Sequence, residues 1–371
     1  MSDYRMCEAS DSINRTMVIS RKLSVFWAII FLLLPSINMA AEVCLPRTGQ
    51  ETCYDKKGAV IPCTGTGQDA DIKAGIRWPK SRFKDNKDGT ITDRFTGLMW
   101  TKNADLSNGA VTWNEAFQHI ETINKDAGTY GYKDWRLPNL NEIKSLINSG
   151  QKNNASWLEY EGFQNVRRLF YWSSTTYAKD TNLAWIVYME GGIIGGQNKY
   201  GSCYILSVRD AKGKASVRLP KTGQKISFTK GDDGDLQKGA AWPLHRFTVK
   251  GDCVKDKLTG LIWAGNANLI NSPLTWQEAL DYVKKMNLCG FEDWRLPNIN
   301  ELRSIINFGE SKNAEWLNSE GFQNVQNFSY WSSSTYATDP GVAFVVPISH
   351  YGMRSGNKST RDYVWPVRDK L

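Results

Sequence analysis

The amino-acid sequence contains one long internal repeat, and this feature constrains its fold most strongly. Several blocks return in the same order. The first copy carries them at residues 78–79, 96–100, 134–139, 161–166 and 171–174, and the second at 242–243, 259–263, 293–298, 320–325 and 330–333. The offset between the copies drifts only from 164 to 159 residues. A period this long indicates duplicated domains rather than a solenoid, and a chain of 371 residues has room for two of them.

The repeat sets the expected domain layout. Residues 78–212 form the first module and residues 242–371 the second. A shorter echo precedes each copy, because residues 45–50 resemble residues 219–224. We interpret 42–77 as an N-terminal linker segment and 213–241 as a linker between modules, and we expect each module to fold independently.

The first 41 residues are typical of an export signal. Arg21 and Lys22 precede an uncharged apolar run, and Ala40 and Ala41 supply small residues where a signal peptidase would cut. The apolar run is shorter than the roughly 20 residues of a membrane span, and a retained anchor is the alternative. The sequence therefore predicts an exported protein, in the periplasm, on the outer surface or secreted, which meets a membrane only through this segment.

Cysteine positions suggest two disulfide bonds. Cys253 and Cys289 occur together in the second copy and have no counterparts in the first, which favours a Cys253–Cys289 pair. By the same logic Cys53 and Cys63 pair locally. Of the seven cysteines, Cys7 lies in the export segment, and the six that follow allow fifteen pairings. The sequence therefore leaves Cys44 and Cys203 unassigned.

Local patterns predict an α+β fold for each module. Asp88-Gly89 between strand-forming residues indicates a hairpin. Thr112 with Glu115, and Thr275 with Glu278, are capping boxes that begin an amphipathic helix. A second helix follows Pro138 or Pro297 in each copy. Strands are expected at 184–189 and 342–348 and again at the end of each copy, so each module has two helices followed by antiparallel strands.

These blocks resemble a known family. The TGLxW, DWRLPNxNE and YWSSxTYA motifs look like the Lcl C-terminal domain, over residues 78–210 and 242–369. The resemblance implies a fold similar to C-type lectins and an exported bacterial protein that functions in binding or adhesion. It implies no shared enzymatic activity and no cofactor.

The motif residues admit two interpretations. They could form a binding surface, but aromatic and small residues in blocks usually pack, and Arg136 could pair with Glu142 or Asp134. We therefore assign a structural role to these motif residues: Trp100, Trp135, Arg136, Trp172, Trp263, Trp294, Arg295 and Trp331.

Catalysis and metal binding find little support in the residues. His119, His245 and His350 have no counterparts in the other copy, so no catalytic triad recurs. We expect no enzyme, no cofactor and no metal site. Asp69 and Asp71 match Asp233 and Asp235, for which a solvated turn is favoured and a weak calcium site is the alternative.

Charge and variability indicate the ligand. The net charge of +8 favours anionic partners such as acidic glycans or envelope polymers; a protein ligand in an envelope assembly is the alternative, and nucleic acid is not expected. The copies differ most before the last strand, where exposed loops supply polar and aromatic side chains. The candidate ligand-binding residues are Tyr351, Arg354, Lys358 and Arg361 in the second copy, with Lys199 and Tyr200 in the first. The oligomeric state stays open.

Overall fold

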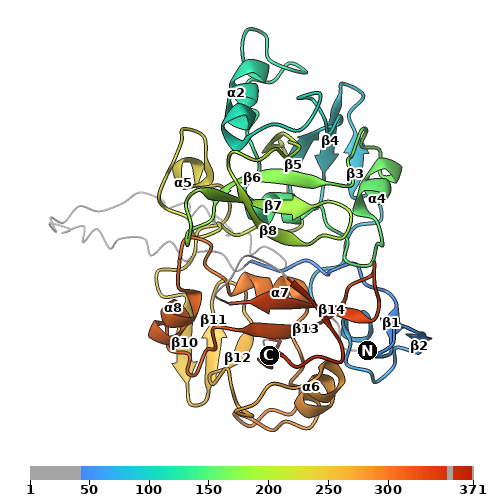
Figure 1. Ribbon diagram of the computed structural model, residues 1–371, viewed down its shortest axis with the longest axis vertical. Helices are drawn as coiled ribbons and strands as arrows, with labels where there is room; N and C mark the ends of the chain where they lie inside the picture. Colours follow the sequence, from blue (N-terminus) through green and yellow to red (C-terminus); the bar gives the residue numbers. More distant parts are fainter. Residues whose placement is uncertain (1–42, 349–353, 370–371) are drawn as a thin grey trace, which may run out of the picture. The chain divides into compact units, whose positions relative to one another are not determined.

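A computed structural model describes residues 43–348 and 354–369. Every element below belongs to one compact unit of the chain, Ala40–Leu371. The elements are helices and antiparallel sheets in the order that the repeat predicts (Figure 1), so the protein is α+β and contains two tandem modules.

The first module contains two sheets with helices between them along the chain. One sheet has the strand order β3-β4-β5-β9 and the other β6-β7-β8. The strands are β3 (Phe83–Asp85), β4 (Thr90–Asp93), β5 (Leu98–Thr101), β6 (Phe170–Thr176), β7 (Leu183–Tyr188), β8 (Ile194–Asn198) and β9 (Val208–Asp210). The helices are α2 (Trp113–Ile123), α3 (Leu140–Lys144) and α4 (Asn154–Tyr160). The last strand returns to the first sheet, where Met99 pairs with Arg209, so the beginning and end of the module lie side by side.

The second module repeats this topology. Its sheets have the orders β10-β11-β12-β16 and β13-β14-β15. The strands are β10 (Phe247–Lys250), β11 (Cys253–Asp256), β12 (Ile262–Ala264), β13 (Ser329–Thr335), β14 (Val342–Pro347), β15 (Arg354–Asn357) and β16 (Val367–Arg368). The helices are α6 (Trp276–Val283), α7 (Ile299–Ser304) and α8 (Asn313–Ser319).

The predicted local signals are present. The Asp88-Gly89 turn joins β3 to β4, and both predicted capping boxes begin α2 and α6. The two copies bury the same large side chains, among them Trp113 and Trp276, whose indole nitrogens donate to the carbonyls of Ser173 and Ser332 at 2.9 and 2.8 Å. Burial of such large rings contributes to the apolar core of each module.

Some elements were missed. The sequence analysis predicted two helices per module, but α4 and α8 form a third, and the TGLxW motif lies in strands β5 and β12 ahead of the helices. Both short helices bury only a few residues, such as Ala155 and Leu158 of α4, so their periodic signal is weak.

Both predicted disulfides are present, Cys53–Cys63 and Cys253–Cys289. The second joins the start of β11 to the turn after α6, two places that are close only in the folded module. Cys203 is a free thiol, buried beside the core of the first module.

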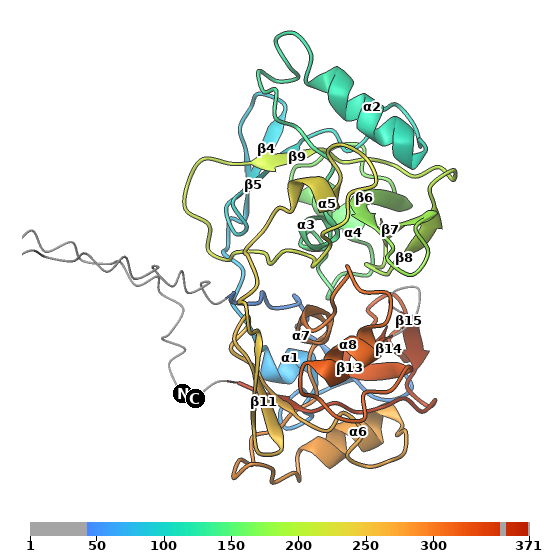
Figure 2. The same ribbon diagram turned by 90° about the vertical axis from the view of Figure 1, so that its left-hand side faces the viewer.

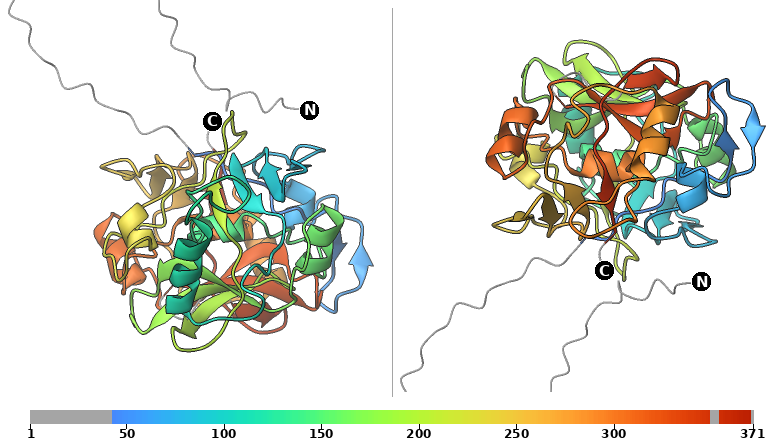
Figure 3. Two further views of the ribbon diagram at one scale, coloured as in Figure 1. Left: turned by 90° about the horizontal axis from the view of Figure 1, so that it is seen from above. Right: turned by 90° about the horizontal axis from the view of Figure 1, so that it is seen from below.

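The two segments interpreted as linkers carry structure of their own. The first contains the hairpin of β1 (Cys53–Tyr54) and β2 (Val60–Ile61), which projects from the segment (Figure 3), followed by α1 (Asp69–Ile72). The second contains α5 (Asp233–Leu236). Helix α1 contacts β13 of the second module, whereas α5 contacts β6 of the first (Figure 2). Each module is therefore covered by the segment that precedes the other module.

Candidate functional site

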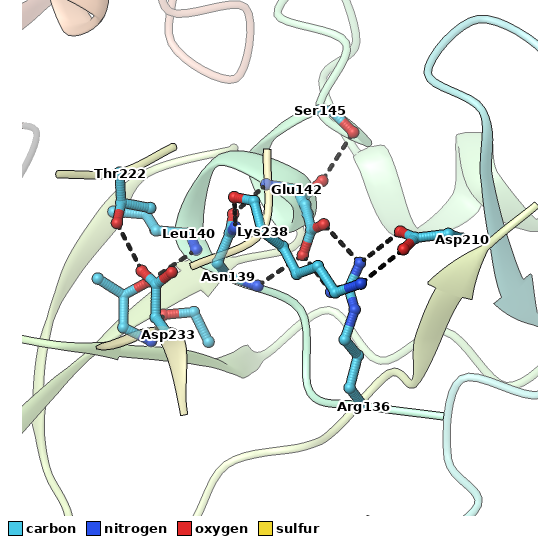
Figure 4. A network of polar contacts seen from close by, with 11 residues as sticks. Arg136, Asn139, Leu140, Glu142, Ser145, Asp210, Thr222, Asp233 and Lys238 are labelled. Atoms are coloured by element: carbon cyan, nitrogen blue, oxygen red, sulfur yellow. Dashed lines mark hydrogen bonds and ion pairs between the residues drawn. The ribbon is translucent and has the colours of Figure 1, made fainter. Parts of the chain in front are cut away.

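An ion-pair network surrounds the DWRLPN motif of the first module, and its central pair, Arg136 and Glu142, is buried (Figure 4). Arg136 makes two parallel hydrogen bonds to Glu142, at 2.6 and 2.7 Å, and a third to Asp210 at 3.0 Å. Glu142 also accepts from the backbone nitrogen of Asn139, which caps α3. Lys238, from the covering segment, donates to Asp210 at 2.7 Å. The network thus attaches both a helix and the covering segment to the motif.

The second module repeats the arrangement. Arg295 makes two hydrogen bonds of 2.6 Å to Glu301 and one of 2.6 Å to Asp369. Of the two partners considered for Arg136, the structure gives it Glu142; Asp134 instead pairs with Arg209 at 2.6 Å. Trp135, Arg136, Trp294 and Arg295 are all buried. They lie within the fold rather than on a surface that a large ligand could reach.

The other motif tryptophans, Trp100, Trp172, Trp263 and Trp331, are also fully buried. Trp172 lies on β6 and Trp331 on β13, and their indole nitrogens donate to the carbonyls of Val111 and Leu274 at 2.8 and 2.7 Å. The same bond in both copies fixes the loop before the long helix of each module.

Two buried aspartates hold the covering segments in place. Asp233 accepts hydrogen bonds of 2.6 Å from the hydroxyls of Thr175 and Thr222. Asp69 accepts from Thr48 at 2.7 Å and from Ser334 of the second module. The solvated turn that the sequence favoured is therefore wrong for both aspartates, because both side chains are buried. Burial raises the pKa of each carboxyl to about 6, although the hydroxyl donors lower it.

Each covering segment also contains a glutamine that bonds the strand residue next to the one that the aspartate contacts. The side chain of Gln224 bonds the backbone of Thr176 in both directions, at 3.0 Å each. Gln50 makes the equivalent pair of bonds to Thr335 and also donates to the carbonyl of Ser149 at 3.2 Å. Gln50 therefore touches both modules at once. These segment residues were not singled out as functional, although their recurrence in the short echo was a visible signal.

The candidate ligand-binding lysines lie against aromatic rings. Lys199 Nζ is 3.9 Å from the centre of the Trp113 ring and 4.8 Å from that of Phe228. Lys358 Nζ is 4.0 Å from the Trp276 ring and donates to the carbonyl of Asp55 at 3.3 Å. Burial lowers the pKa of each ammonium to about 8.

Lys358 is only 1% exposed, so its assignment to an exposed loop is wrong. A sequence of glycines and polar residues predicted a solvated loop, but the hairpin segment covers this lysine. Lys199 is half-buried, and its neighbour Tyr200 is 82% exposed.

The other candidate ligand-binding residues, all in the second module, lie in different surroundings. Arg361 is exposed and pairs with Glu278 at 3.0 Å. Arg354 begins β15, opposite Val345. Tyr351 lies outside the described residues. In the first module, Lys199 Nζ also donates to the hydroxyl of Thr176 at 2.9 Å, and its neighbour Tyr200 is the exposed one of the two.

Within residues 43–348 and 354–369, no group of three or more His, Cys, Asp or Glu side chains is arranged to hold a metal ion. In the same part of the chain, no helix has the length and apolar character needed to cross a bilayer.

The fold defines a class: an α+β protein of two tandem modules, each completed by a segment from elsewhere in the chain. The Lcl C-terminal domain matches residues 89–209 and 252–368, more than half of the chain, and the protein belongs to this family. Tandem domains of this kind suggest a non-catalytic extracellular binding protein in general terms. Comparison with curated proteins finds no match.

Proposed function

We propose that this protein is exported and binds acidic glycans or anionic envelope polymers, without catalysing a reaction on them. Family membership supports a binding role in general terms, and two disulfides are consistent with an oxidising compartment. The net charge of +8 favours an anionic ligand. The absence of recurring histidines between the copies supports a non-catalytic role.

One observation carries the proposal furthest: an exposed aromatic side chain stands beside a lysine at the place where the second segment crosses the first module. This surface, the Tyr200 surface, consists of Lys199, Tyr200 and Phe228, and the exposed Lys225 and Lys230 lie on either side of Phe228 in the sequence. An aromatic face packs against the apolar face of a sugar ring, and ammonium groups pair with carboxylates or sulfates. With a pKa of about 8, Lys199 remains mostly charged at neutral pH.

The candidate residues of the second module are less available to a ligand. Lys358 is covered, and Arg361 already pairs with Glu278. We therefore assign polymer binding chiefly to the first module, with the second contributing charge.

The experiment compares binding to immobilised heparin, as an acidic probe, with binding to dextran of similar length. The double variant Tyr200→Ala/Phe228→Ala should lose at least tenfold in affinity for heparin, and parent binding should weaken steeply as salt rises. Tyr160→Ala is the matched control, because Tyr160 is equally exposed, at 87%, but lies on α4. Equal binding to dextran, or an unchanged double variant, would contradict the proposal.

A second function is favoured by exposed apolar side chains at matching positions. Leu169 is 50% and Phe328 is 63% exposed, each just ahead of the YWSS motif of its module. Such side chains suit a protein partner in an envelope assembly. Replacing both with Ser should abolish recovery of the protein in a cross-linked envelope complex while heparin binding persists; the reverse result favours the glycan ligand.

A further inference from the structure

The same pair of a lysine and a tryptophan occurs in both modules, at positions that the repeat makes equivalent. Lys199 Nζ lies 3.9 Å from the centre of the Trp113 ring, and Lys358 Nζ lies 4.0 Å from that of Trp276. The backbone carbonyl of each lysine also accepts a hydrogen bond from the backbone nitrogen of its tryptophan, at 3.1 and 3.3 Å. The second module therefore contains a counterpart of the lysine site in the Tyr200 surface.

A covering segment adds a second aromatic ring to each pair. The Phe228 ring centre is 4.8 Å from Lys199 Nζ, and the Tyr54 ring centre is 5.8 Å from Lys358 Nζ. Phe228 and Tyr54 each follow the glutamine of their segment by four positions. Each ammonium group thus lies near one ring of its own module and one ring of the segment, an arrangement that favours cations.

The two covering segments differ by one insertion. Gln50 and Asp69 are nineteen positions apart, whereas their counterparts Gln224 and Asp233 are nine apart. The ten additional residues of the first segment form most of the hairpin of β1 and β2, which a disulfide bond closes. The structure thus contains one pair of lysine and tryptophan with the hairpin and one without it.

The hairpin covers the pair in the second module. Lys358 donates to the carbonyl of Asp55 at 3.3 Å. In the turn, Gly58 lies so close to the second module that an added Cβ would be 2.9 Å from the backbone nitrogen of Gly341. Burial lowers the pKa of Lys358 to about 8, and the carboxylates of Asp55 and Asp339 act in the opposite direction. The hairpin therefore places a carbonyl oxygen and a negative charge near the buried ammonium group.

The lysine without a hairpin makes a different bond. Lys199 is half-buried and donates to the hydroxyl of Thr176 at 2.9 Å. The equivalent hydroxyl, on Thr335, is buried and has no hydrogen-bond partner among the described residues. A buried hydroxyl without a partner costs free energy. By analogy with Lys199, Lys358 can donate to this hydroxyl when the hairpin does not hold it.

We propose that the second module carries a second site for acidic ligands, and that the β1–β2 hairpin occupies this site as a built-in competitor. The inference rests on the proposed function, because the ligand is the one assigned to the Tyr200 surface. With the hairpin docked, the chain binds one acidic group. With the hairpin displaced, Lys358 and Trp276 are open to a second. The second site is the weaker of the two, since Ser359 stands at the position of Tyr200.

The first test removes the insertion. Deletion of residues 55–64 together with Cys53→Ser gives the first segment the spacing of the second, which has Ser227 at the equivalent position. Isothermal titration with a heparin tetrasaccharide should show one site on the parent chain and two on this variant. Adding Lys358→Met to the deletion should return it to one site.

A smaller change tests the same point in a hairpin of full length. Gly58→Val should force the turn away from Gly341. Gly65→Val is the matched control, because both glycines have a positive φ, +87° and +77°, but an added Cβ at Gly65 has no described atom within 4 Å. Amine labelling with peptide mapping should find Lys358 protected in the parent and the control, and reactive in Gly58→Val and in the deletion variant.

The outcomes separate this inference from the proposed function. A parent without a site and a deletion variant with one Lys358-dependent site would contradict binding at the Tyr200 surface and support the second site. No site in either chain would refute both. A folded deletion variant in which Lys358 is labelled but the number of sites is unchanged would overturn the inference alone, as would a Lys358 that stays protected in both variants.

Discussion

Asp69, in the segment before the first module, accepts a hydrogen bond from Ser334, 265 residues later in the second module. The equivalent Asp233 bonds Thr175 of the first module at 2.6 Å. The two bonds form one pattern, in which each module is closed by the carboxylate of the segment that precedes its neighbour.

These carboxyls should make stability depend on pH. The folded pKa of each is about 6, above the unfolded value of 3.8. The folded state therefore binds more protons between these values, and stability falls as pH rises from about 4 to 6. Each residue contributes at most about 3 kcal/mol to this change.

The check is a series of urea unfolding curves between pH 4 and 8. In the parent, the free energy of unfolding should fall between pH 4 and 6. Asp69→Asn and Asp233→Asn should each make that fall smaller. Asp126→Asn, an exposed change, should follow the parent curve. A parent whose stability rises steadily from pH 4 to 6, with the same slope in both variants, would show that the carboxyls are not perturbed.

The exchange of segments bears on the expectation that each module folds alone. A fragment of residues 213–371 lacks Asp69 and Gln50, so Ser334 and Thr335 lose buried partners. We now expect this fragment to unfold at a lower temperature than the full chain, and addition of residues 43–212 to restore part of the loss. Calorimetry measures both, and an unchanged transition for the lone fragment would support independent folding instead.

The ion pair of the motif should matter strongly to stability. Glu142→Gln leaves Arg136 with a weakened partner in a buried site, and breaking such a pair typically costs about 3–5 kcal/mol. Glu301→Gln should behave alike in the second module, because Arg295 is held in the same way. Denaturant melts of both variants, with the exposed Glu121→Gln as a reference, provide the measurement.

The buried Lys358 and the exposed Arg361 should differ in their effect on stability. Lys358→Ala removes a side chain that fills the space between Trp276 and the hairpin segment, and should lower the melting temperature clearly. Arg361→Ala, on an exposed side chain, should change stability by within about 0.5 kcal/mol. Thermal melts that rank the two variants the other way round would refute the packing of Lys358.

The two disulfides should contribute unequally to the stability of the folded state. The Cys253–Cys289 bond closes a loop with a separation of 36 residues and the Cys53–Cys63 bond one of 10. Loop-closure entropy gives about 4 and 3 kcal/mol respectively. Paired Cys→Ser variants in denaturant melts measure each contribution, and non-reducing peptide mapping checks the pairing itself.

The sequence predicted local structure better than long-range contacts. Capping boxes, the hairpin turn and the pair of Arg136 with Glu142 depend on residues a few positions apart, and all are present. The burial of Asp69, Asp233 and Lys358 depends on a segment that packs against a distant module. Aspartate and lysine side chains are usually exposed to solvent, and only tertiary contacts reverse that expectation.

A cavity lined by residues of both modules illustrates the same limit. Lys144 of α3 and Arg303 of α7 both line it, although nothing in the sequence around either residue marks them as meeting. Their recurrence at one offset was visible, but a shared space between the copies was not.

The exchanged segments have a consequence for how the molecule assembles. If the chain were cut between its modules, each half would hold an arm that belongs to the other, which is the arrangement of a domain-swapped dimer. Joining the halves in one chain replaces a bimolecular encounter with an intramolecular one, at an effective concentration that a short tether can bring to about the millimolar range. The pairing of the halves then no longer depends on how dilute the protein is.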